Sequence, residues 1–127
     1  MMLRNALATV ALFGSLMLAA CDSGPSGPGT LIASVTGSSL GGVVLEITGV
    51  GIRGFEGLDN TQVYAAPLAG SPNAHRVLLI DAEGGDLRFE IQVEDIGMND
   101  PVMHVVSAAG VDNLTQLAAG IDVRVER

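Results

Sequence analysis

Residues 87–94 read LRFEIQVE, and apolar and polar side chains alternate at every position of this stretch. Successive side chains of a β-strand point to opposite faces of its sheet, so Leu87, Phe89 and the two later apolar residues would share one face. Arg88 and the three other polar side chains would share the opposite face. The stretch therefore predicts a strand with one face in a core and the other in water.

The same texture of short aliphatic runs continues on both sides of this stretch. Alternation recurs in residues 43–48 and 121–126, and runs rich in Gly, Pro, Asn and Asp separate the segments. About seven strands are predicted in all, at residues 31–36, 43–48, 61–66, 75–81, 87–94, 102–108 and 121–126. A short helical turn is expected within residues 112–119.

Seven short strands without a long helical pattern favour an all-β fold, an antiparallel β-sandwich. The strand rhythm of residues 30–127 resembles that of cohesin-like and other immunoglobulin-like modules of bacterial envelope proteins. The resemblance implies an immunoglobulin-like or cohesin-like sandwich, and it carries no functional residue with it. The length of 127 residues allows one such domain.

The composition points to an aliphatic core and an acidic surface. Hydrophobic residues make up 48% of the chain, but aromatic residues only 3%, so Val, Ile and Leu must fill the core. The formal net charge is −8, and all six basic residues are Arg. This charge repels nucleic-acid phosphates and anionic lipid head groups, so we expect no nucleic-acid partner.

The N-terminus has the pattern of a secretory signal helix. Arg4 precedes a run of 15 mostly apolar residues, 6–20, which is short for a membrane-spanning helix. The run ends in Leu18-Ala19-Ala20-Cys21, and this sequence resembles the lipobox of bacterial lipoproteins. The resemblance implies cleavage between Ala20 and Cys21 and attachment of a diacylglycerol to the Cys21 thiol.

Residues 21–29, CDSGPSGPG, are predicted to be the lipidated Cys and a flexible Gly/Pro/Ser tether. The chain is thus expected to consist of a signal peptide (1–20), this tether and a β-sandwich domain (30–127). The expected location is the bacterial cell envelope, with the domain held at a membrane by lipid on Cys21. Which membrane holds it, and whether it faces the periplasm or the cell surface, is left open.

One glycine-rich segment is the predicted partner-binding loop. Residues 49–54, GVGIRG, match the dinucleotide-binding spacing G-x-G-x-x-G, but no helical pattern follows to hold a pyrophosphate. A mobile loop over residues 49–60 that binds a protein partner is the preferred interpretation. Its candidate contact residues are Ile52, Arg53, Phe55 and Leu58, although Phe55 could instead close the end of the sandwich.

Metal-binding and catalytic signals are weak. Asp81, Glu83 and Asp86 surround a Gly-Gly pair and are possible calcium ligands, although a hairpin turn with solvated acids explains them as well. The same two interpretations, calcium ligands or solvated acids of a turn, apply to Glu94, Asp95, Asn99 and Asp100. His75 and His104 have no metal-ligand spacing, and no nucleophile motif is present. We therefore expect no cofactor and no catalysis.

The sequence thus predicts a lipid-anchored, non-catalytic binding or scaffolding module of the cell envelope. The possible partner is an envelope protein. A small-ligand or calcium-binding lipoprotein is the alternative, and an envelope hydrolase is a weaker one.

Overall fold

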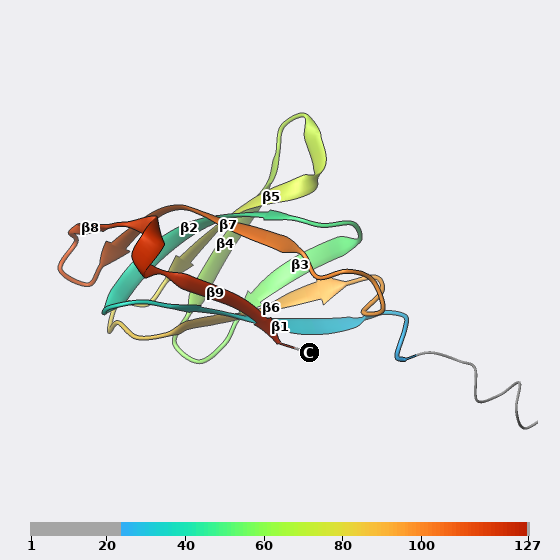
Figure 1. The fold of residues 1–127 in the computed structure, drawn as a ribbon, viewed down its shortest axis with the longest axis horizontal. Coiled ribbons are helices and arrows are strands. Elements are labelled where there is room, and N and C mark those ends of the chain that lie inside the picture. Colours follow the sequence, from blue (N-terminus) through green and yellow to red (C-terminus); the bar gives the residue numbers. More distant parts are fainter. Residues whose placement is uncertain (1–23, 127) are drawn as a thin grey trace, which may run out of the picture.

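A computed structural model describes residues 24–126, and these residues form two antiparallel sheets (Figure 1). Residues 1–23 lie outside the described part, and with them the predicted signal segment, its lipobox and Cys21. The nine strands are β1 (Gly29–Thr36), β2 (Leu40–Thr48), β3 (Ile52–Gly57), β4 (Gln62–Leu68), β5 (Ser71–Ile80), β6 (Leu87–Val93), β7 (Val102–Gly110), β8 (Thr115–Gln116) and β9 (Asp122–Glu126). A 3-10 turn, η1, covers Ala118–Gly120.

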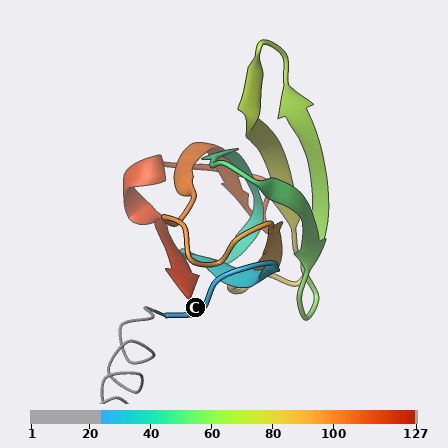
Figure 2. The ribbon, with the colours of Figure 1, turned by 90° about the vertical axis from the view of Figure 1, so that its right-hand side faces the viewer.

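The two sheets pack face to face as a β-sandwich. One has four strands in the order β3-β6-β1-β9, and the other has five in the order β4-β5-β2-β7-β8. Among the nine strands, only β4–β5 and β7–β8 are consecutive pairs within one sheet, so every other connection crosses between sheets. The β4–β5 hairpin extends well beyond the body of the sandwich (Figure 2). The all-β sandwich predicted from the alternating segments is confirmed.

The core lies between the inward faces of both sheets. Every apolar residue of the stretch 87–93 is buried, and Phe89 is the largest fully buried side chain. Leu45 and Ile47 of β2 face it from the five-stranded sheet and are also fully buried. Because successive side chains of a strand point to opposite faces of its sheet, the residues that point away from this core make the two outer faces of the sandwich.

The two sheets are joined closely where β3 turns into β4. Leu58 donates its backbone N–H to the carbonyl of Arg88, and the buried Thr61 accepts the Arg88 N–H on its Oγ1 at 3.1 Å. A Cβ at Gly57 would overlap the carbonyl oxygen of Thr61, so this corner requires glycine. The corner therefore fixes the edge of β6 against the start of β4.

The seven predicted strands are all present, and two more appear. The predicted mobile loop at residues 49–60 is wrong over its central part, because Ile52–Gly57 is strand β3 and pairs with β6. The segment expected to hold a helical turn contains the two-residue strand β8 and then η1. Glycines at 51, 54 and 57 hide β3 from the sequence pattern, because glycine interrupts the alternation and has low β-propensity.

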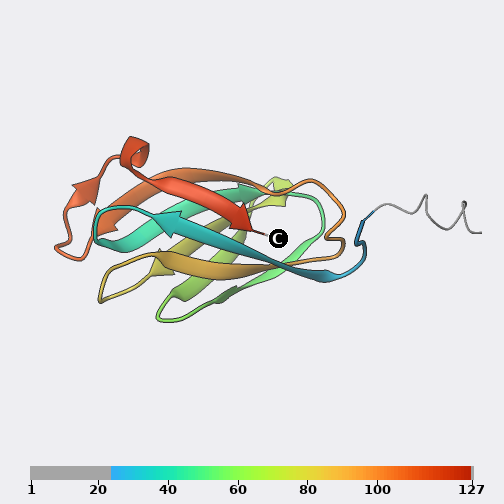
Figure 3. The same ribbon diagram turned by 60° about the horizontal axis from the view of Figure 1, so that its bottom comes forward.

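The chain enters the sandwich at the end that carries the β6–β7 connection (Figure 3). Gly27 donates its N–H to Asp95 Oδ1 at 3.0 Å, and its carbonyl accepts the N–H of Ile96 at 2.9 Å. The segment between β7 and β9, with β8 and η1, lies at the opposite end (Figure 1). The last residues before β1 are therefore held on the domain, and the two ends of the sandwich are distinct.

Candidate binding surface

The outer face of the five-stranded sheet consists of three rows of side chains that cross β4, β5, β2 and β7. Strand register places these rows side by side. The middle row is Tyr64, Leu78, Val44 and Ser107; the row toward the β8 end is Gln62, Ile80, Gly42 and Ala109; the third row is Ala66, Arg76, Glu46 and His104. We call these twelve positions the outer apolar face, because its first two rows carry no charge.

The centre of this face is apolar where an antiparallel sheet facing water would have polar side chains, although five of the twelve positions are polar or charged. Tyr64 is 57% exposed, and Leu78 and Val44 are part-exposed beside it. The face forms because residues 77–80 read VLLI without alternation, so Leu78 and Ile80 point away from the core that buries Val77 and Leu79.

A shallow hollow of about 410 Å³ opens at the β8 end of the outer apolar face, lined in part by Gly42, Ile80 and Ala109. Gly42 leaves this space because it has no side chain. A Cβ added there would meet only the Leu79 carbonyl oxygen, at an ordinary 3.6 Å. Exposed apolar side chains continue past the hollow into the segment after β7, including Val111 and Leu117, which is 82% exposed.

The third row holds the charged groups of this face. Arg76 Nη2 and Glu46 Oε2 form an ion pair at 3.3 Å across β5 and β2, and His104 lies opposite Glu46 on β7. The outer apolar face holds one Arg and one Glu, whose formal charges cancel, whereas the whole chain carries a formal net charge of −8.

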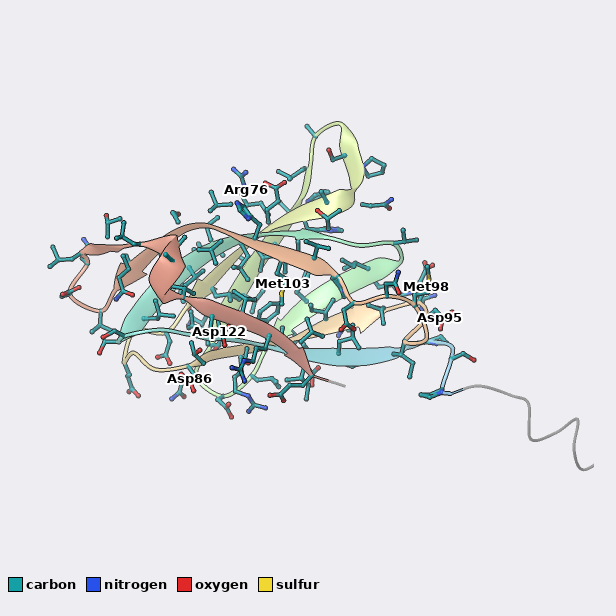
Figure 4. The ribbon with its side chains drawn as sticks, viewed as in Figure 1. Arg76, Asp86, Asp95, Met98, Met103 and Asp122 are labelled. Carbon is teal, nitrogen blue, oxygen red and sulfur yellow. The ribbon has the colours of Figure 1, made fainter. Side chains whose placement is uncertain are left out.

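The outer face of the four-stranded sheet has the opposite character. Glu56, Glu90 and Glu126 lie in one row across β3, β6 and β9, with Ile32 of β1 between the last two. Directly opposed like charges destabilise a strand pair. Figure 4 shows Arg76 and Asp122 on opposite sides of the sandwich, with Met103 between them. Arg88 and Arg124 lie in the neighbouring row, on either side of Ser34, but the three glutamates and Asp122 outnumber them. We therefore call the outer side of the four-stranded sheet the acidic face.

The predicted partner-binding residues do not form one exposed loop. Phe55 packs on the core, with its ring centroid 5.4 Å from that of His75 and 6.4 Å from that of Phe89. Ile52 is also packed against the core, and Leu58 belongs to the β3–β4 corner. Arg53 alone is well exposed, in an ion pair with Glu94 at 3.7 Å.

The acidic turn after β5 connects the two sheets and is not a hairpin turn, because β5 and β6 lie in different sheets. Asp81 is buried rather than solvated, and its Oδ1 accepts the N–H of Glu83 at 3.0 Å. Glu83 and Asp86 are exposed. In residues 24–126 no three His, Cys, Asp or Glu side chains come together in a group that could hold a metal ion.

The second acidic segment also has a structural role. Asp95 Oδ1 accepts the backbone N–H of Gly97 at 2.8 Å and that of Gly27 at 3.0 Å. These donors, Gly97 first and Gly27 second, hold the pKa of the Asp95 carboxyl below its usual value, because they stabilise the charged form. Asp95 thus fastens the incoming chain to the end of the sandwich.

The chain was compared with known protein families, curated proteins and solved structures. No family model, curated protein or solved structure matches this chain. Between residues 24 and 126, no helix has the length and apolar character needed to cross a membrane.

The partner-binding residues predicted from the sequence and the outer apolar face lie on different elements. The outer apolar face comes from four strands and becomes visible only when their register aligns Tyr64, Leu78 and Val44. One signal was present in the sequence: an uninterrupted apolar run of strand length is typical of a strand covered on both faces.

Proposed function

We propose that this chain is a lipid-anchored, non-catalytic binding module of the bacterial cell envelope, and that it docks a protein partner on the outer apolar face. One observation carries the docking proposal. Tyr64, Leu78 and Val44 form an uncharged row on the outside of a sheet whose counterpart carries a row of glutamates. Large exposed apolar surfaces on soluble domains commonly serve as interaction sites.

The position of the incoming chain supports the anchoring proposal. Only five residues separate Cys21 from Gly27, which is fixed on the domain, so a lipid on Cys21 would keep that end within about 21 Å of the membrane, the length of six extended residue steps. The hollow is lined by Gly42 and by Ala109, which pairs with β8, and Figure 1 shows β8 at the other end of the sandwich. A partner could therefore reach it away from the lipid surface.

Replacement of the proposed lipidation site tests the anchor. Cys21→Ser in the full chain should abolish incorporation of labelled fatty acid and leave the chain unprocessed or released. The readouts are the intact mass of the chain and its distribution between membrane and soluble fractions. Membrane partitioning at the wild-type mass in the Cys21→Ser variant would contradict the anchor.

Site-specific photocrosslinking in intact cells tests the docking surface separately. A photoreactive amino acid at position 64 lies on the outer apolar face, and one at position 124 lies on the acidic face. Both native residues are exposed, Tyr64 at 57% overall and the Arg124 side chain at 74%. We expect a discrete adduct from position 64 alone. Equal adducts, or none from either site, would overturn the docking proposal.

A further inference from the structure

We propose that the partner seated on the outer apolar face is a second copy of this chain, packed sheet to sheet about a two-fold axis along the row Tyr64–Leu78–Val44. This inference rests on the proposed docking function and adds the identity of the partner. Closed two-fold dimers are the commonest oligomers of soluble proteins, and they bring the same surface of both copies together.

Charge selects this surface for self-association. Two chains of net charge −8 repel one another, and contact through the acidic face would bring together two surfaces on which Glu56, Glu90, Glu126 and Asp122 outnumber Arg88 and Arg124. The outer apolar face is the opposite case, since Arg76 and Glu46 balance each other there. Two copies can therefore meet on it without bringing net charge together.

The composition of the rows selects the axis. If the axis follows the middle row, Leu78 and Val44 meet their own symmetry mates, and uncharged side chains fill the centre of the contact. The charged row of each copy then lies across from the row that contains Ile80 and Gly42 in the other copy. Arg76 and Glu46 keep their own ion pair at the rim, where water remains.

The small size of the contact predicts that dimerisation depends on anchoring in a membrane. Three rows of four positions are fewer than the roughly 20–30 residues a side of a standard interface. Association in dilute solution should therefore be weak. Chains anchored by lipid in one membrane have a high effective concentration, which strengthens a weak contact without any new interaction.

Thiol crosslinking of the full chain in its native membrane tests the inference. Facing sheets lie about 10 Å apart, which is too far for a disulfide, so the probe is a short bis-maleimide. Val44→Cys places a thiol at the proposed axis, and Ser34→Cys places one at an equivalent central position of the acidic face. The wild-type chain controls for any unmodified Cys21.

We expect Val44→Cys to give a product of twice the monomer mass, and Ser34→Cys to give at least ten-fold less. Adding Gly42→Leu should abolish the Val44→Cys product, because the new side chain fills the hollow while its Cβ meets no steric obstacle in the monomer. Leu78→Asp should also abolish it by placing two carboxylates face to face.

The outcomes separate this inference from the proposed function. A Val44→Cys product of another mass, with an adduct at position 64, would overturn self-association and leave docking intact. If neither the Val44→Cys product nor the position 64 adduct forms, self-association and docking are both overturned. A dimer product that survives both Gly42→Leu and Leu78→Asp would overturn the proposed axis and surface.

Discussion

The two sheets of the sandwich are alike inside and different outside. Phe89 of β6 and Leu45 of β2 are both fully buried in the shared core. On the outside, β6 presents only the polar side chains Arg88, Glu90 and Gln92, whereas β5 presents Leu78 and Ile80 beside Arg76. The comparison teaches that strict alternation indicates a strand with one buried face. An uninterrupted apolar run within a strand, such as residues 77–80, indicates a second face that another surface can cover.

The largest effect should come from the inner faces, where the two sheets are equivalent. Phe89→Ala should lower the free energy of unfolding by about 3–5 kcal/mol, through lost burial and the cavity left behind. Leu45→Ala, from the other sheet, should cost a comparable 2–5 kcal/mol. Urea denaturation followed by circular dichroism measures both. A loss below about 1 kcal/mol in either variant would contradict a shared core.

The next effect concerns the corner that holds the two sheets together. Thr61→Val keeps the side-chain shape but removes the oxygen that accepts the Arg88 N–H, leaving a part-buried donor without its partner. We expect a loss of about 1–3 kcal/mol in the same denaturation experiment. Thr36→Val, a part-exposed threonine on the acidic face, is the matched control and should change stability by less than about 0.5 kcal/mol.

A smaller effect should distinguish the outer faces directly. Glu90→Lys converts the like-charge contact with Glu56 into an opposite-charge contact and should stabilise the domain by about 0.5 kcal/mol. Because the origin is electrostatic, the gain should shrink as NaCl rises from 10 mM to about 1 M. Thermal melting at several salt concentrations measures it. An equal gain at all salt concentrations would disprove the proposed repulsion.

The smallest effect is local and depends on pH. The pKa of Asp95 is lowered in the folded state, so its contribution is complete above the pKa of an unfolded aspartate, about 3.9, and is lost as pH falls through the lower folded value. Hydrogen exchange should show the Gly27 amide becoming unprotected in that acidic window before the β6 amides do. Asp95→Asn cannot ionise at position 95 and should remove this pH dependence. Unchanged pH dependence in Asp95→Asn would assign the effect to another group.

Much of the fold could be predicted from local patterns. The alternation of residues 87–94 correctly assigned Phe89 and its apolar neighbours to the core, because register with the partner strands is not needed to choose a buried face. β3 was missed because Gly54 and Gly57 break the pattern, although the corner needs Gly57 for its close approach to Thr61.

The candidate site depends on contacts that no local pattern contains. Tyr64, Leu78 and Val44 come from three strands, and only their register unites them in one row. The hydrogen bond from Gly27 to Asp95 spans 68 residues of sequence, so the acidic segment gave no hint that it fastens the incoming chain. The prediction of a hairpin turn with a solvated Asp81 was wrong because the turn connects strands of different sheets, which the local sequence does not reveal.

The most direct test of the central difference is the labelling rate of one thiol on each outer face in intact membranes. Val44→Cys and Ser34→Cys are part-exposed positions on comparable strands, and each rate is divided by that of the same variant after dilution in detergent. If the outer apolar face is covered by a partner, maleimide should label Val44→Cys at least ten-fold more slowly in membranes than after dilution, and Ser34→Cys equally fast in both. Equal rates for Val44→Cys before and after dilution would show that this face is bare and would contradict the account.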